Sequence, residues 1–260
     1  GSINLSRFVK DSFEGRAFDF ESFREVIHLA TRFLDNVIDI NRYPIPEIGE
    51  ISRGNRKIGL GVMGFADMLY SLGIPYNSEE AVKIGEEIMA FLNEESHKAS
   101  EKLAEEKGTF PNWKGSVWQK QKRPMRNACT TTVAPTGTIS IIADCSGGIE
   151  PLFSLVFIRN VLNGKQLVEV NRSFESVAGD KGFYSKALME QIGQSGSIQG
   201  IENIPEDIRR VFVTAHDIAP EWHIRMQGAF QKHCDASISK TINFVSQSTV
   251  DDVRKIYLLA

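Results

Sequence analysis

The feature that most constrains this chain is residues 126–140, which read R-N-A-C-T-T-T-V-A-P-T-G-T-I-S. The β-branched and apolar run at residues 129–133 is typical of a buried strand. Pro135 has no N–H to give to a sheet, so the strand has to end there. The glycine at position 137 and the apolar residues 141–143 then predict a tight turn that leads into a short helix.

This turn, called the threonine turn below, is predicted to present several backbone N–H groups at one point. A helix N-terminus attracts anions, phosphate above all, and threonine and serine hydroxyls can add donors. The Gly-Lys-Ser/Thr of a Walker motif is missing, which excludes a P-loop NTPase. From these residues alone, a phosphate site and an ordinary strand-to-helix turn stay equal alternatives. The candidate phosphate-binding residues are Pro135, Thr136, Gly137, Thr138, Ile139 and Ser140.

Four stretches of the chain resemble the large subunits of ribonucleotide reductases. They are residues 1–5 (G-S-I-N-L), 56–69 (R-K-I-G-L-G-V-M-G-F-A-D-M-L), 126–153 and 215–244, in the family order. The motif P-T-G-T-I-S and the following sequence I-A-D-C-S-G-G-I-E-P look most like the adenosylcobalamin-dependent class. The iron- or manganese-dependent class is the close rival.

The resemblance implies an α/β fold, a ten-stranded barrel of which residues 1–260 would form the C-terminal half as one helix-rich domain. It implies radical conversion of ribonucleotides to deoxyribonucleotides, with the threonine turn holding the substrate by its phosphates. Adenosylcobalamin is implied by the resemblance only. The implied partners are the ribonucleotide substrate and the N-terminal half of the reductase, and a homodimer is left open.

The chain departs from the family in one respect. The family's catalytic cysteine and glutamate lie on an N-x-C-x-E loop, which this sequence lacks, so no catalytic residue is assigned. The resemblance matches none of the family's redox cysteines to Cys129, Cys145 or Cys234, which we interpret as packing residues. An alternative from another class is a non-catalytic nucleotide-binding module, or the partner subunit of a split reductase. Reductase activity after addition of the missing half would separate the two.

Residues 59–64 fit the dinucleotide motif G-x-G-x-x-G, but that motif needs a strand before it and a βαβ unit around it. A polar stretch precedes them, so we interpret residues 56–72 as a helix whose glycines allow close packing. A dinucleotide oxidoreductase is the weakest alternative. His216 and His223 lack a third ligand at a recognisable interval. No second cysteine or suitably spaced histidine joins His233, Cys234 and Asp235, so no metal or nucleophile site is predicted there either. Glu150 is given no role.

Apolar spacing predicts long helices over residues 19–41 and 77–107, capped by Asp19 and by Asn77 or Ser78. Shorter helices are predicted over residues 172–178, 185–192, 206–212, 221–233 and from Ser248 or Thr249 onwards, with Pro205 and Pro220 as first helical residues. Strands are predicted at residues 3–5, 129–133, 152–158, 166–170 and 238–244, with Asn163 and Gly164 as a hairpin turn.

Composition excludes several classes of protein. A net charge of -3 gives no basic footprint for nucleic acid. No apolar run reaches the roughly 18–20 residues of a membrane span, and the first residues lack the basic and apolar regions of a signal peptide. Three widely spaced cysteines are typical of a reducing compartment. We expect a cytoplasmic protein that binds neither nucleic acid nor membrane.

Overall fold

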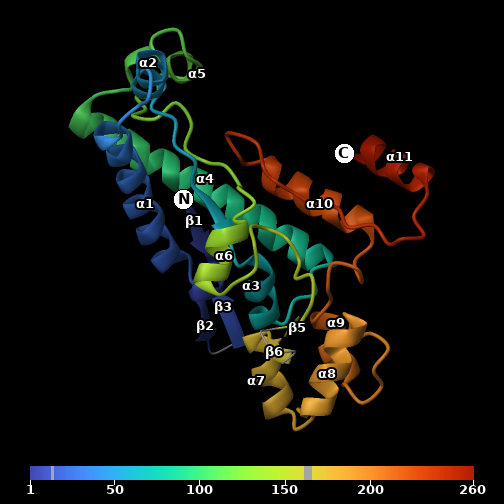
Figure 1. Ribbon diagram of the computed structural model, residues 1–260. Coiled ribbons are helices and arrows are strands. Elements are labelled where there is room, and N and C mark those ends of the chain that lie inside the picture. The colour runs from blue at the N-terminus through green and yellow to red at the C-terminus, as the bar shows by residue number, and fades with distance from the viewer. Residues whose placement is uncertain (13–14, 161–165) are drawn as a thin grey trace.

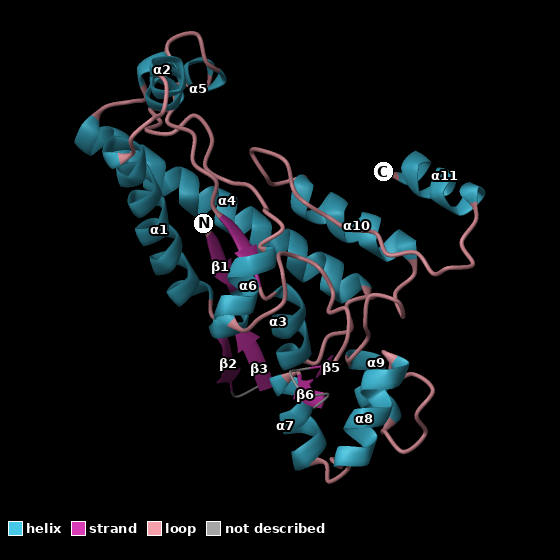
Figure 2. Cartoon of the chain, viewed as in Figure 1, coloured by secondary structure: helices cyan, strands magenta, loops and turns pink. Residues whose placement is uncertain are grey.

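The computed structural model describes residues 1–12, 15–160 and 166–260. Helices dominate it, and the strands form short pairs among them (Figure 2). In chain order the elements are β1 (Ser2–Asn4), the 3-10 helix η1 (Leu5–Phe8), β2 (Val9–Ser12), β3 (Gly15–Phe18), α1 (Phe20–Ile40), α2 (Pro46–Asn55), β4 (Gly61–Met63), α3 (Phe65–Leu72), α4 (Glu79–Lys107), the 3-10 helix η2 (Pro111–Trp113), α5 (Val117–Lys120), α6 (Gly137–Ala143), β5 (Val156–Asn160), β6 (Gln166–Val170), α7 (Arg172–Asp180), α8 (Lys186–Ser195), α9 (Glu206–Val211), α10 (Pro220–Gln231) and α11 (Val250–Leu259).

Four chain segments run parallel to one another, and we call them the parallel row. β1 pairs with β4 in parallel, Leu60 bridges Thr131, and Val133 bridges Ile238. The order across the row is therefore β1, β4, residues 130–133 and residues 236–239. Because all four segments point the same way, their ends define an amino edge and a carboxyl edge.

The predicted helix over residues 56–72 is wrong in its first half, where β4 stands instead. A Cβ at Gly61 would lie 2.1 Å from the backbone oxygen of Thr132, and one at Gly59 would lie 2.6 Å from Cγ2 of the same residue. The glycines are therefore needed for close approach of a neighbouring chain segment, not for helix packing. Gly64, with a φ of 72°, ends the strand segment and caps α3.

The segments at residues 129–133 and 238–244 form isolated bridges rather than the continuous strands predicted. Side chains replace part of the ladder there. The Thr132 hydroxyl donates to the backbone oxygen of Ser237 at 2.7 Å, and Thr131 Oγ1 accepts from the N–H of Asp235 at 2.9 Å. Threonine competes with backbone pairing in this way because its hydroxyl reaches neighbouring main-chain groups.

The strand predicted over residues 152–158 begins only at Val156, because the Ser154 hydroxyl donates to the Val156 oxygen at 2.8 Å and holds a turn. β5 and β6 pair antiparallel from Val156↔Val170 to Asn160↔Gln166, and the predicted return strand at residues 166–170 is confirmed. The hairpin turn predicted at Asn163 and Gly164 lies outside the described residues.

The two long helices are confirmed together with their caps. Asp19 accepts from the N–H of Ser22, and Ser78 accepts from that of Ala81. α4 contacts α1 on one side and α10 on another, and the three helices lie beside the parallel row in Figure 1. A Cβ at Gly85 would lie 2.7 Å from the Phe230 ring, so α10 can approach α4 only because residue 85 is glycine.

A second hydrophobic cluster is formed by residues of β5, β6, α7, α8 and α9, in the lower part of Figure 1.

α7, α8 and α10 confirm the predicted helices, and Pro220 is the first residue of α10 as expected. Pro205 differs, because it caps α9 from outside. Thr249 caps α11 in a capping box with Asp252. Among the described residues, no helix combines the length and the apolar character that crossing a membrane needs.

The amino edge of the parallel row is held by a buried polar network. Asp35 is fully buried and accepts from Arg56 Nε at 2.9 Å and from Asn127 Nδ2 at 3.0 Å. Asn127 in turn accepts from the Ser100 hydroxyl at 2.9 Å. Arg126 Nε adds a longer contact of 3.4 Å to the second carboxylate oxygen. The network joins α1, α4 and two segments of the row, because each of its groups has a partner on another element.

Candidate functional site

The threonine turn lies at the carboxyl edge, directly after Val133. Thr136 caps α6 with a φ of 55°, and Gly137, Thr138 and Ile139 form the exposed first turn of that helix. Within residues 1–12, 15–160 and 166–260, the backbone N–H groups of these three residues donate no hydrogen bond, whereas the N–H of Ser140 already donates to Thr136 at 2.9 Å. Three unpaired donors that face solvent at one helix end are what an anion needs.

Thr136 itself does not offer its hydroxyl to a ligand. The residue is buried, and its Oγ1 accepts from the backbone N–H of Gly148 at 2.7 Å. A threonine in the left-handed region costs about 1–3 kcal/mol, so the contact with Gly148 has to hold the turn in that conformation. Thr136 therefore stabilises the conformation of the turn and does not contact a ligand through its hydroxyl.

The remaining predicted residues divide into two groups. Thr138 is exposed, Ile139 has 46% of its surface exposed, and Pro135 is exposed but has no N–H to donate. Ser140 is buried, and its hydroxyl donates to the backbone oxygen of Gly137 at 3.4 Å. Of the six predicted residues, Pro135, Gly137, Thr138 and Ile139 are exposed on the turn, and Thr136 is buried beneath it. The Ser140 hydroxyl faces inward.

Residues 146–150, called the brace loop below, cross the carboxyl edge next to the threonine turn. The N–H of Ser146 donates to Asp67 at 2.6 Å, and the oxygen of Ser146 accepts from Gly64 at 2.7 Å. At the other end of the loop, Glu150 accepts from the ammonium of Lys240 at 2.5 Å and from the N–H of Thr241 at 2.6 Å. The loop is therefore tied to β4, α3 and the fourth segment of the row.

Sequence reasoning assigned no role to Glu150 and did not single out Lys240. The Lys240 side chain is 0% exposed, and its ammonium also contacts Nδ1 of His223 at 2.8 Å. Burial and the nearby Lys240 charge lower the pKa of His223 to about 4, so its imidazole is neutral at neutral pH. Burial lowers the pKa of Lys240, and the Glu150 carboxylate opposes that shift. The available signal was a lysine inside an otherwise strand-like stretch, S-K-T-I-N-F.

The cysteines behave as the sequence analysis expects of packing residues. All three are free and half-buried. Burial, with a smaller effect of Asp235, raises the pKa of Cys129 to about 11, and burial with Asp67 raises that of Cys145 to about 11. Burial raises the pKa of Cys234 as well. Thiols with such pKa values stay protonated at neutral pH and are poor nucleophiles.

The G-x-G-x-x-G stretch does not form a pyrophosphate site. Gly59 and Gly61 lie within the parallel row against Thr132, not in a turn after a strand. The N–H of Gly64 is already bonded to Ser146, and the first turn of α3 carries the buried carboxylate of Asp67. A negative side chain at that helix start repels a phosphate.

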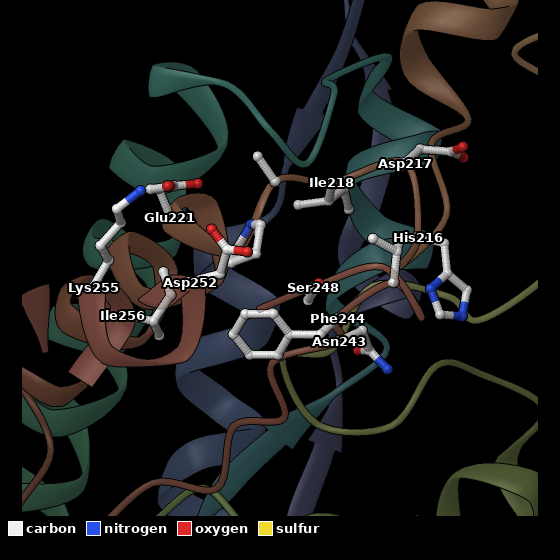
Figure 3. Close-up of a pocket in the computed structure, with 13 residues that line it drawn as sticks. His216, Asp217, Ile218, Glu221, Asn243, Phe244, Ser248, Asp252, Lys255 and Ile256 are labelled. Carbon is white, nitrogen blue, oxygen red and sulfur yellow. The ribbon is translucent and has the colours of Figure 1, made fainter. Parts of the chain in front are cut away.

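A separate pocket of about 380 Å³ lies between α10 and α11 (Figure 3). Figure 3 shows Phe244 between the α11 residues Asp252 and Ile256 and the segment that carries Ile218. No residue of the threonine turn lines this pocket, and its carboxylates, Asp217, Glu221 and Asp252, outnumber its one lysine. That charge disfavours a phosphate, so the threonine turn remains the better candidate for one.

The histidines do not gather into a metal centre. Within the described ranges, no three His, Cys, Asp or Glu side chains come close enough to hold a metal ion. His216 packs edge-on against Phe153 with a ring distance of 5.0 Å, and His223 contacts Lys240. His233 lies 3.3 Å from Glu86 in an ion-pair geometry. Each of the three has a partner that does not involve a metal.

Comparison with known proteins points to one family. The family model described as "Ribonucleotide reductase, barrel domain" matches residues 1–124 and 120–260. A vitamin B12-dependent ribonucleoside-diphosphate reductase of Thermoplasma acidophilum is 54% identical over 100% of this chain and 33% of its own length. A protein of the same name from Mycobacterium tuberculosis is 50% identical over 100% of this chain and 37% of its length.

A solved structure agrees with these matches. The class Id ribonucleotide reductase alpha subunit of Actinobacillus ureae superposes with a TM-score of 0.78 at 26% identity. The match covers 92% of this chain and 44% of that one. The chain thus spans about a third of the length of the curated relatives just named.

Proposed function

This chain belongs to the ribonucleotide reductase barrel-domain family, and from that premise we propose that it forms the substrate-phosphate side of a reductase that converts ribonucleotides to deoxyribonucleotides. The relatives are named ribonucleoside-diphosphate reductases, so a ribonucleoside diphosphate is the substrate proposed here. The rest of the reductase polypeptide is the proposed partner, and it would supply the radical chemistry.

The single observation that carries this proposal is the set of three unpaired N–H groups at Gly137, Thr138 and Ile139. They lie together at the carboxyl edge, where α/β barrels build their active sites. Main-chain donors of this kind bind the charged end of a substrate and leave its other end free to react. Holding the phosphates fixes the ribose in place through remote binding.

The proposal is tested by replacing Thr138 with aspartate in the reductase reconstituted with the rest of its polypeptide. A carboxylate in the first turn of α6 stabilises the helix by about 0.3–1 kcal/mol. The same carboxylate repels a bound phosphate, so affinity for the nucleoside diphosphate falls by about a hundredfold or more. Isothermal titration calorimetry measures the affinity, and urea unfolding measures the stability.

Ala187→Asp is the matched control, because Ala187 is an exposed residue in the first turn of α8. It adds the same charge at an equivalent helix position away from the threonine turn and leaves nucleotide affinity unchanged. If Thr138→Asp binds the nucleotide as tightly as the unmodified protein, the phosphates bind elsewhere and the proposal is wrong.

Vitamin B12 appears in the names of the relatives, and it is proposed for this protein on that basis alone. A histidine that could coordinate the cobalt would have to be accessible. At the carboxyl edge His223 is buried, and its Nδ1 is bonded to Lys240. His216 is exposed and packs edge-on against Phe153, and no step of the proposed function runs through the cofactor.

Four further points are proposed with the family premise. The ten-stranded barrel would be completed by the rest of the polypeptide, because among the described residues the parallel row has only four segments and does not close. Residues 1–260 act as one domain. A homodimer and a cytoplasmic location are the expected assembly and compartment. A non-catalytic nucleotide-binding subunit remains the alternative, and absence of reductase activity in the reconstituted protein would favour it.

A further inference from the structure

The brace loop lies directly against the backbone of the threonine turn. A Cβ at Gly147 would be 3.1 Å from the oxygen of Pro135, and a Cβ at Gly148 would be 3.1 Å from the oxygen of Ala134. The N–H of Gly148 donates to Thr136 Oγ1 at 2.7 Å. Any shift of this loop is therefore passed on to the turn, because no side chain separates the two backbones.

The far end of the brace loop is fixed by one ion pair, in which the Lys240 side chain is buried and the Glu150 side chain is 24% exposed. Lys240 has three donors, and all three have acceptors: Glu150 Oε2 at 2.5 Å, His223 Nδ1 at 2.8 Å and the oxygen of Thr241 at 2.6 Å. Glu150 Oε1 also accepts from the N–H of Thr241 at 2.6 Å. The pair holds the loop to the fourth segment of the row with two charge-assisted bonds.

The residue between the two ends is fixed as well. The Tyr76 hydroxyl donates to the oxygen of Ile149 at 2.8 Å, and both residues are buried. The loop therefore has few ways to relax locally. Only the buried Ile149 separates Glu150 from Gly148, so a shift of Glu150 is passed on to Gly148.

We propose that Glu150 and Lys240 are positioning residues for the threonine turn: their ion pair holds the brace loop so that Gly148 keeps Thr136 in its left-handed conformation. The three unpaired N–H groups then stay aimed at one phosphate. Neither side chain touches the substrate. This inference rests on the proposed phosphate function and names the residues that maintain its geometry.

The test compares how tightly the reconstituted reductase binds a ribonucleoside diphosphate and the same nucleoside without phosphates. Both ligands share base and ribose contacts, so the ratio of their affinities isolates the phosphate contribution. Lys240→Met keeps the length of the side chain and removes its charge. It lowers the diphosphate affinity by about tenfold and leaves the nucleoside affinity unchanged, because a small misplacement of donors weakens only the group they hold.

Glu150→Gln provides an independent variant that keeps the shape of the other partner. It lowers the same ratio, whether or not Lys240→Met yields folded protein. The double variant lowers the ratio no further than Lys240→Met alone, because residues that act as one unit are non-additive. Lys232→Met is the matched control: it breaks the ion pair of Lys232 with Glu86, on a lysine that is 63% exposed, and leaves the ratio unchanged.

The outcomes separate this inference from the function on which it rests. If Thr138→Asp abolishes the phosphate contribution and both Lys240→Met and Glu150→Gln keep it, the phosphate site stands and the positioning role is wrong. Equal weakening of diphosphate and nucleoside by the two variants also overturns it, since that result indicates general loss of structure. If Thr138→Asp has no effect, the phosphate function itself fails.

Discussion

The two edges of the parallel row differ in which of their polar groups are left unpaired. At the amino edge, Asp35 and Asn127 are fully buried, and their polar atoms are hydrogen bonded to Arg56 and Ser100. At the carboxyl edge, the first turn of α6 is exposed, and its three N–H groups have no partner among the described residues. Satisfied groups hold a structure together, whereas unsatisfied donors facing water are available to a ligand.

The difference teaches that the same row serves stability at one edge and binding at the other. Each edge also has one non-glycine residue in the strained left-handed conformation, and a different set of contacts holds it. Arg56 at the amino edge adopts a left-handed φ of 48° and is held by Asp35 and Asp39, whereas Thr136 adopts a φ of 55° and is held by the brace loop. We therefore expect substitutions at the amino edge to change unfolding, and those at the carboxyl edge to change nucleotide affinity.

The largest effect is expected from Asp35→Ala, which leaves the buried Arg56 guanidinium without its main partner. Removing one member of a buried ion pair costs about 3–5 kcal/mol. Urea unfolding of the reconstituted protein measures the loss. Asp11→Ala serves as the control, because Asp11 is 91% exposed in its contact with Arg16 and its loss leaves the unfolding midpoint unchanged. Similar midpoints for the two variants would contradict the structural role of the amino edge.

A pair of glycine substitutions comes next. Gly61→Ala places a Cβ 2.1 Å from the Thr132 oxygen inside the row, and overpacking of this kind costs about 1–3 kcal/mol or more. Gly137→Ala has open space around its Cβ and stabilises α6 by about 0.5–1 kcal/mol. The added methyl group nevertheless crowds a phosphate on the exposed turn. Calorimetry should show weaker diphosphate binding for Gly137→Ala only, and unfolding should show lower stability for Gly61→Ala only.

A smaller, pH-dependent effect is expected at Asp235, which lies on the amino side of the fourth segment. Burial alone would raise the pKa of Asp235, but hydrogen bonds from His97, Thr130 and Asn93 outweigh burial and hold that pKa below its ordinary value. A depressed carboxylate pKa adds stability above about pH 4, and this is lost as the pH falls from there toward the folded-state pKa.

Asp235→Asn removes this contribution. Urea midpoints of the unmodified protein should therefore fall more steeply between pH 5 and pH 3 than those of the variant, about one pH unit on either side of the ordinary Asp pKa. Parallel curves would show that the hydrogen bonds to Asp235 do not favour its charged form.

The smallest effects test the hydroxyls of Thr138 and Ser140, two of the threonine and serine hydroxyls that the sequence analysis counted as donors. Ser140→Ala should change diphosphate affinity less than about twofold, because its hydroxyl is buried and donates to Gly137. Thr138→Ala should weaken binding by a few-fold at most, since its exposed hydroxyl adds to main-chain donors that remain. A larger loss for Ser140→Ala than for Thr138→Ala would mean that the turn rearranges when the nucleotide binds.

The long helices were predictable because their signals are local. Asp19 and Ser78 cap them at the expected points, and apolar spacing marks their buried faces. β4 was missed because a three-residue strand containing glycine carries no alternation, and its pairing depends on Thr132, far away in the chain. The threonine turn was predictable as a turn because proline and glycine mark it, and the resemblance supplied its proposed ligand.

The polar networks could not be predicted from local sequence. Asp35, Arg56 and Asn127 meet across 21 to 92 residues of chain, and charged side chains are rarely this buried. Lys240 and Glu150 are 90 residues apart and were invisible for the same reason. Such pairs emerge only when the parallel row brings distant segments to a common edge.

A Cβ at Gly147 or Gly148 would lie only 3.1 Å from the carbonyl oxygen of Pro135 or Ala134, so a side chain there would push the brace loop and the turn apart. The threonine turn and the brace loop therefore have to be replaced together when segments are exchanged between relatives. A chimera that receives only residues 134–140 from a relative would meet a loop shaped for another turn, whereas a graft of residues 134–150 carries both halves of the fit. Engineers who wish to alter phosphate preference should therefore transplant the whole stretch.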